Sequence, residues 1–170
     1  MQQRASVEPL DETLDHARGP AATHVLLEYG DYECPYSRAA YRQIQIVERA
    51  LELRFAFRHF PLTQIHPHSL AASAAAEAAA LQGRFWEMHD LLFERQKALE
   101  DDDLLGYARE LGLELERFES DRHGNEVGER IVRDVESGLA SGEVRGTPTL
   151  FIDGFVYRDS YAADALMEAL

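Results

Sequence analysis

A strand, a helix and a second strand are predicted in quick succession within residues 23–59, and this order leaves few folds open. The first strand, 23–29, contains the continuous apolar run 25–27, which is typical of a strand covered on both faces. Residues 53–59 alternate between apolar and polar or small side chains, which indicates a second strand. Such units are right-handed and their strands are parallel in nearly all known cases. We therefore expect the strand-to-helix loop at the carboxyl edge of a sheet.

The helix between these strands is predicted from about residue 35 to residue 51, because apolar side chains recur there at spacings of three and four. Pro35 suits the first turn of a helix, where its missing N–H is not needed. The only cysteine of the chain, Cys34, therefore lies at the helix N-terminus. Partial positive charge and unpaired amide donors at that position favour a thiolate. The placement indicates a reactive thiol and not an inert buried one.

Cys34 opens the run Cys-Pro-Tyr-Ser, in which Ser37 occupies the place of a second cysteine. A Cys-x-x-Cys between a strand and a helix would predict an internal dithiol. With one sulfur, no internal disulfide can form, and exchange at Cys34 needs a thiol from outside. The Ser37 hydroxyl can donate to the sulfur, whereas Glu28 and Asp31 would oppose the anion or relay protons.

The composition argues against several partners and locations. A formal net charge of −14 disfavours sequence-independent binding to nucleic acid or to an anionic membrane, because both require a positive face. No apolar run reaches the ~18 residues of a membrane span, and residues 1–15 lack the apolar core of a signal peptide. We therefore expect a cytoplasmic protein without a nucleic-acid or membrane partner.

The rest of the chain divides at its turn signals. Residues 1–20 are polar and end in a Gly-Pro pair, so we expect an N-terminal extension before a single domain at 21–170. Helical patterns dominate residues 69–141. The helices expected there span 70–82, 85–97, 103–111 and 125–139. The elements expected after them are strands at 149–152 and 155–157 and a helix at 161–170.

Three stretches of sequence carry a family resemblance. They are EYGDYECPY at 28–36, FRHFPL at 57–62 with GRFWEMH at 83–89, and GTPTLFIDG at 146–154. In this order they resemble the DsbA-like thiol-disulfide oxidoreductases of the thioredoxin superfamily. The resemblance implies an α/β thioredoxin fold with an all-helical insertion between its βαβ and ββα halves. Residues 21–62 and 143–170 would form the thioredoxin core, and 63–142 the helical insertion.

The resemblance also implies roles for individual residues. The position of Cys34 is that of the attacking thiolate, and Thr147-Pro148 resembles the cis-proline loop that faces it. The backbone of Thr147 would pair with an extended substrate strand beside the sulfur. Ser37 stands where dithiol members have the resolving cysteine. We expect catalytic roles for Cys34, Ser37 and Pro148, and substrate contacts from Pro35, Tyr36 and Thr147.

The expected function is thiol-disulfide exchange through a mixed disulfide on Cys34. Its partners would be cysteine-containing proteins or peptides and low-molecular-weight thiols, with glutathione as a candidate co-substrate. Either a monothiol mechanism or an engineered replacement of the resolving cysteine accounts for Ser37. Two alternatives remain open: a redox-silent thioredoxin-fold module that binds clients, and a glutathione-dependent isomerase or transferase of the same superfamily.

Four histidines and four aromatic residues are candidates for a metal site and for a client-binding groove. Four histidines raise the question of a metal, namely His59, His66, His68 and His89. They follow no spacing typical of zinc sites, so we expect no metal ligand and no cofactor. Four aromatic residues are candidates for an apolar client groove, namely Tyr32, Tyr36, Phe60 and Trp86. Aromatic residues at such spacings more often belong to the core.

Overall fold

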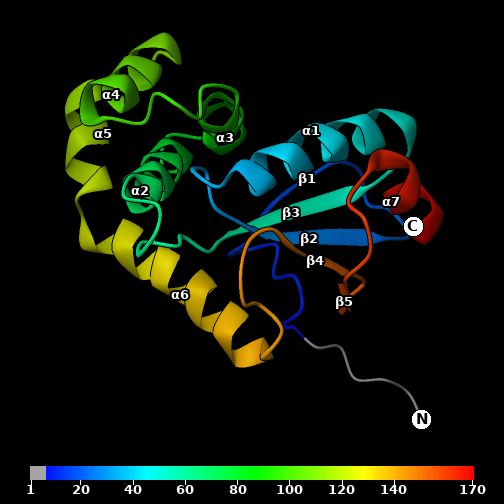
Figure 1. The fold of residues 1–170 in the computed structure, drawn as a ribbon. Coiled ribbons are helices and arrows are strands. Elements are labelled where there is room, and N and C mark those ends of the chain that lie inside the picture. The colour runs from blue at the N-terminus through cyan, green and yellow to red at the C-terminus, as the bar shows by residue number, and fades with distance from the viewer. Residues whose placement is uncertain (1–6) are drawn as a thin grey trace.

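One mixed sheet of five strands organises residues 7–170, the part of the chain that the computed structural model describes (Figure 1). The strands are β1 (His16–Arg18), β2 (Val25–Gly30), β3 (Arg54–His59), β4 (Thr149–Ile152) and β5 (Phe155–Tyr157). Their order in the sheet is β1-β3-β2-β4-β5. The central strands β2 and β3 are parallel, as predicted, whereas β1 and β4 pair with them antiparallel. The Cys34 loop therefore lies at the carboxyl edge of the parallel pair.

Helices surround this sheet on both faces and beyond one end (Figure 1). They are α1 (Pro35–Ala50), α2 (Ser69–Ala80), α3 (Phe85–Glu94), α4 (Asp101–Glu110), α5 (Leu115–Arg122), α6 (Asn125–Ser141) and α7 (Ala163–Ala169). Helices α1 and α7 lie together on one face, α6 lies toward the opposite face, and α2 to α5 form a group beside the sheet (Figure 1). The order of elements agrees with the predicted strand-helix-strand unit, helical block and strand-strand-helix unit.

Two hydrophobic clusters explain why the central strands are apolar on both sides. Leu26 and Phe55 belong to the larger cluster, which includes residues of α1, α7 and the helical group. The neighbouring residues Leu27 and Ala56 point to the other face and pack in a smaller cluster with Val7. Because side chains alternate along a strand, a continuous apolar run supplies both clusters. The prediction of a strand covered on both faces is confirmed.

Some helix boundaries differ from the predicted ones for local reasons. Helix α4 begins at Asp101, two residues before the predicted start, because Glu100 and Asp103 form a reciprocal capping box. Helix α5 was not predicted as a separate element. Its sequence LERFESDR is mostly polar and buries Phe118 and Arg122, which gives almost no apolar periodicity.

The N-terminal segment differs most from the expectation of an extension over residues 1–20. Strand β1 pairs with β3 at the edge of the sheet, so at least His16–Arg18 belong to the fold. Asp15 is buried and forms an ion pair with Arg58 of β3. Polar side chains hold this segment, and hydrophobic patterns do not reveal such contacts. Residues 1–6 lie outside the described part of the chain.

Candidate active site

Cys34 lies in the turn between β2 and α1, as the N-cap residue of α1. Its amide donates a hydrogen bond to the Asp31 carbonyl oxygen at 3.1 Å, and its side chain is buried, with 3% of the residue exposed. No side chain caps this end of α1, and its first turn contains no acidic residue. The positive end of the helix dipole therefore lies at Cys34, and the nearest acidic residues, such as the buried Asp31, precede the helix in the same turn.

The loop before β4 lies directly against this sulfur. Cys34 Sγ donates to the carbonyl oxygen of Thr147 at 3.4 Å, and the Thr147–Pro148 peptide bond is cis. Strand β4 brings the loop there, because Thr149 pairs with Tyr29 in the antiparallel ladder between β4 and β2. The structure thus brings together Cys34 and the Thr147-Pro148 pair, which are far apart in the sequence.

Ser37 lies in the first turn of α1 and is completely buried. Its Oγ accepts a hydrogen bond from the Asp31 amide at 3.2 Å. Among the hydrogen bonds of residues 7–170, none joins Ser37 to Cys34. The position is therefore an internal one beside the Cys34 turn, and its side chain is oriented by the backbone of that turn.

Pro35 and Tyr36 form the exposed side of the site, and 66% of Tyr36 is accessible to solvent. One pocket, of about 380 Å³, is lined in part by Pro35 and Gln96. Another, of about 330 Å³, is lined in part by Pro148. The two prolines that flank the sulfur therefore each border a surface hollow.

The other aromatic residues proposed for a client groove belong to the core. Tyr32 is completely buried and donates or accepts a hydrogen bond with His89 Nδ1 at 2.9 Å. Phe60 is 8% exposed, and Trp86 packs against the larger hydrophobic cluster. Only Tyr36 of the four side chains stands out from the surface beside Cys34.

Asp31 holds the Cys34 turn against the segment after β3. This carboxylate is buried, and its Oδ1 accepts from the Glu33 amide at 2.8 Å. Its Oδ2 accepts from the Leu62 amide at 2.9 Å and from His66 Nδ1 at 2.8 Å. Because three hydrogen-bond donors hold its carboxylate, Asp31 fixes the position of the Cys34 turn.

Gln96 is a positioning residue that the sequence analysis missed. It follows α3, and its Nε2 donates to the carbonyl oxygens of both Tyr32 and Cys34 at 2.8 Å. The segment that follows α3 therefore helps to fix the Cys34 turn. No local pattern signals this role, because the contact joins segments 62 and 64 residues apart.

Glu28 lies in the middle of β2 and is buried to 1% exposure. Its Oε1 has no hydrogen-bond partner among residues 7–170. Burial raises the pKa of this carboxyl to about 8, although the nearby charge of Arg18 partly opposes the shift. Glu28 therefore has the protonation behaviour of a group that can exchange a proton near neutral pH, and its role as a relay for Cys34 stays a prediction.

The pKa of Glu28 predicts a pH dependence of stability. The ordinary pKa of 4.5 applies in the unfolded chain, and the folded value is about 8. Between these values the folded chain keeps a proton that the unfolded chain has released, so the free energy of unfolding falls as the pH rises. We expect the wild type to lose on the order of 3–4 kcal/mol between pH 5 and pH 8, and Glu28→Gln to remove this loss.

Urea unfolding at both pH values measures this effect as a difference between the wild type and Glu28→Gln. The exposed acid Glu52, changed to Gln, is the matched control and should follow the wild type. If all three proteins lose stability in parallel over this range, Glu28 does not have the raised pKa.

Solved structures of other proteins share this fold. The chain matches a thioredoxin-like oxidoreductase from Silicibacter pomeroyi with a TM-score of 0.82 and 27% identity, over 98% of this chain and 95% of that chain. It matches oxidised BdbD from Bacillus subtilis with a TM-score of 0.80 and 17% identity, over 98% of this chain and 96% of that one. The thiol-disulfide exchange protein α-DsbA2 from Wolbachia pipientis gives a TM-score of 0.81 at 18% identity, over 93% and 86% of the two chains. The predicted thioredoxin fold with a helical insertion is confirmed.

Curated relatives with higher identity carry a different name. The Na⁺/H⁺ antiporter NhaA 1 of Salinispora arenicola is 43% identical over 95% of this chain and 25% of its own length. The Na⁺/H⁺ antiporter NhaA of Herminiimonas arsenicoxydans is 44% identical over 95% and 26%. The chain thus spans about a quarter of these relatives. Within residues 7–170, no helix combines the length and the apolar character that crossing a membrane requires.

A protein-family model matches most of the chain. The model, described as thioredoxin, matches residues 13–170, which include Cys34, Ser37 and the Thr147-Pro148 pair. The match also begins before β1, in agreement with the place of that strand in the sheet. The chain belongs to the thioredoxin family, in its DsbA-like branch with a helical insertion.

Proposed function

We propose that this protein carries out thiol-disulfide exchange at Cys34 by a monothiol mechanism. The observation that carries the proposal is the meeting of three features at one atom. The sulfur lies at the N-terminus of α1, it contacts the carbonyl oxygen of Thr147 at 3.4 Å, and the exposed Tyr36 follows Cys34 by two residues. The helix end favours negative charge on the sulfur, and the neighbouring loop offers a backbone surface for a client.

The reaction proceeds in two exchanges of sulfur partners. The Cys34 thiolate attacks one sulfur of a client disulfide, the client S–S bond breaks, and a bond forms between Cys34 and that sulfur. The second client sulfur leaves as a thiolate and takes a proton from water. An outside thiolate, from glutathione or from the client itself, then attacks the mixed disulfide and releases the Cys34 thiolate. After attack by glutathione, the client sulfur is joined to glutathione, and a further exchange with a second glutathione, which does not involve Cys34, releases the client thiol and oxidised glutathione. Reduction therefore consumes two outside thiols, whereas attack by a client thiolate leaves a rearranged client disulfide and consumes none.

Binding of an extended client would use the rim of the site. Thr147 precedes the β4 ladder, which begins at Thr149, so its main chain lies next to the sulfur at the end of the paired strand. Pro35 and Pro148 border the two hollows on either side. A peptide laid across Tyr36 and Pro148 would bring its sulfur to Cys34, which is otherwise covered.

Mixed-disulfide formation tests the proposal. The reduced protein is incubated with a glutathionylated peptide, and intact mass spectrometry should show an adduct on Cys34 that excess glutathione removes. Cys34→Ser should give no adduct while it keeps the wild-type circular dichroism spectrum. Turnover that requires glutathione would identify the glutathione-dependent variant of this function. An adduct equally abundant in Cys34→Ser, or none in the wild type, would overturn the proposal.

A second candidate function is a redox-silent binding module associated with a membrane transport protein. The observation that favours it is the 43% identity to a segment of an Na⁺/H⁺ antiporter, together with the single sulfur of the site. The same experiment separates the two functions. Equal affinity of the wild type and Cys34→Ser for a client peptide, without an adduct in either, would support the module. The cytoplasmic location expected from the sequence stays a prediction.

A further inference from the structure

Two histidines and one glutamate from three separate elements meet at a buried point. His16 is on β1, His59 is the last residue of β3, and Glu77 is on α2. Glu77 Oε1 is 2.7 Å from Nε2 of His16 and 2.7 Å from Nε2 of His59. The side chains of His16, His59 and Glu77 are 18%, 0% and 6% exposed, and their ligand atoms all lie within 4.8 Å of one another.

The sheet register explains why the two imidazoles face the same space. His16 pairs with Phe57 in the antiparallel ladder, and His59 follows Phe57 by two residues on the same face of β3. The ring of His16 stacks on Phe85, with the ring centroids 3.6 Å apart and an interplanar angle of 9°. Backbone pairing and stacking thus hold the two imidazoles in place, and the longer side chain of Glu77 closes the third side.

We propose that His16 Nε2, His59 Nε2 and the Glu77 carboxylate form a binding site for a divalent transition metal of the Zn²⁺ class. Two imidazoles and one carboxylate are a ligand set that zinc accepts, and they leave a fourth position for water. Metal bonds of about 2.0–2.1 Å in a tetrahedral site place ligand atoms about 3.3 Å apart. The two contacts of 2.7 Å would each widen by about half an ångström, which a rotation of the Glu77 side chain can supply.

The positions of the protons on the two imidazoles are compatible with metal binding. Without a metal, one oxygen of Glu77 accepts Nε2–H donors from both rings, and a metal at Nε2 requires each ring to carry its proton on Nδ1. His59 Nδ1 is buried and has no hydrogen-bond partner among residues 7–170, so the change of tautomer breaks no bond there.

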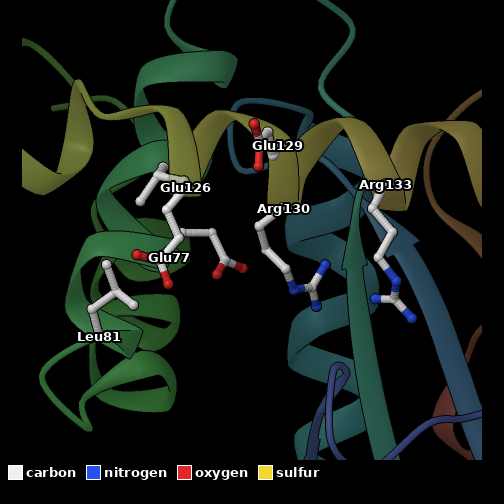
Figure 2. A pocket seen from close by; sticks show the side chains of 7 residues that line it. Glu77, Leu81, Glu126, Glu129, Arg130 and Arg133 are labelled. Atoms are coloured by element: carbon white, nitrogen blue, oxygen red, sulfur yellow. The ribbon is translucent and has the colours of Figure 1, made fainter.

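A surface pocket of about 310 Å³ gives the cluster a route to solvent, because Glu77 is one of its lining residues. Figure 2 shows Glu77 on α2 and Glu126 on α6 lining the same pocket, with Arg130 farther along α6. The guanidinium of Arg130 is ion-paired with Asp134. The pocket is also lined by Glu129 and by Arg133, which is ion-paired with Asp134 as well. With three carboxylates and two guanidiniums, its lining carries one formal negative charge in excess.

Metal titration of the tag-free protein tests the site. Zn²⁺ alone is added in isothermal calorimetry, and the metal content after dialysis is measured by mass spectrometry. All proteins carry Cys34→Ser as well, so that no thiolate competes for the ion. We expect one Zn²⁺ per chain and a higher melting temperature with Zn²⁺. His16→Phe keeps the stacking on Phe85, and Glu77→Gln keeps the hydrogen-bond acceptor, yet each should lower the affinity by at least about 10-fold.

The matched control is His123→Gln, which removes an exposed imidazole outside the cluster and should bind Zn²⁺ as the parent does. Histidine ring NMR on the parent protein gives a readout that does not depend on variants folding: the Nε2 signals of His16 and His59 should move on addition of Zn²⁺. Absence of Zn²⁺ binding by the parent would overturn the proposal. So would an affinity unchanged in His16→Phe, or ring signals that move only for other histidines.

Discussion

Asp15→Ala is expected to destabilise the protein by about 3–5 kcal/mol, because it leaves the charge of Arg58 buried without its partner. Arg58 Nε and Nη2 donate to the two oxygens of Asp15, each at 2.8 Å, and both side chains are 0% exposed. Arg58 Nη1 also donates to the Glu8 carbonyl oxygen at 3.1 Å and to the Tyr29 hydroxyl at 2.8 Å. The pair therefore fastens the N-terminal segment to the sheet. Urea unfolding at pH 7 measures the loss.

A control and a rescue separate this charge effect from simple truncation. Glu12→Ala removes an exposed acid of the same segment, whose partner is Arg54, and should cost much less. The double variant Asp15→Ala with Arg58→Met should recover part of the loss, because it leaves no uncompensated charge in the interior. Equal destabilisation by Asp15→Ala and Glu12→Ala would contradict the prediction.

The Asp15 effect should also depend on pH. Burial raises the pKa of Asp15, but the hydrogen bonds and charge of Arg58 outweigh it and hold the pKa below its ordinary value. For a carboxyl with a lowered folded pKa, the stabilisation is present above the unfolded pKa and is lost as the pH falls through the folded one. The difference between the wild type and Asp15→Ala should therefore shrink in acid.

The sequence predicted the parts of the fold whose hydrophobic patterns are periodic or continuous. Strand β2 has the run Val25–Leu27 and helix α1 has an apolar face, and each packs as the pattern indicates. Strand β1 has three residues, too few to show a period, and it is held by the ladder with β3 and by the buried Asp15 beside it. Arg58 occupies a polar position in an alternating strand, a pattern that normally indicates solvent and here marks an internal ion pair.

The candidate site also has features that the sequence predicted and features that it did not. The approach of Cys34 to Thr147-Pro148 was expected from the family resemblance, and the pairing of β4 beside β2 accounts for it in the structure. The contacts of Gln96 could not be predicted, because they depend on where the helical group places one side chain. The expectation of no metal rested on local spacing among histidines. A cluster assembled from β1, β3 and α2 has no local spacing to detect.

Ser37→Cys is expected to convert the protein into a dithiol enzyme and to raise its rate of insulin reduction by about 100-fold or more, with dithiothreitol as the electron donor. Residues three apart on a helix have Cβ atoms about 5–6 Å apart, and a small adjustment at a helix end brings them within the distance of a disulfide. Ser37 is buried in the first turn of α1, directly after the Cys34 turn. The new thiolate would attack the mixed disulfide from within the molecule, so release would no longer wait for an outside thiol.

Three comparisons decide how this result bears on the mechanism. Oxidation of Ser37→Cys should lower its mass by two hydrogen atoms, which reports the internal disulfide. Ser37→Ala should reduce insulin as slowly as the wild type, because it removes the hydroxyl without adding a sulfur. Combining Ser37→Cys with Cys34→Ser should abolish the gain, since the attacking sulfur is then missing. An internal disulfide that forms without any gain in insulin reduction would mean that clients do not reach Cys34, and the binding-module function would then be preferred over exchange.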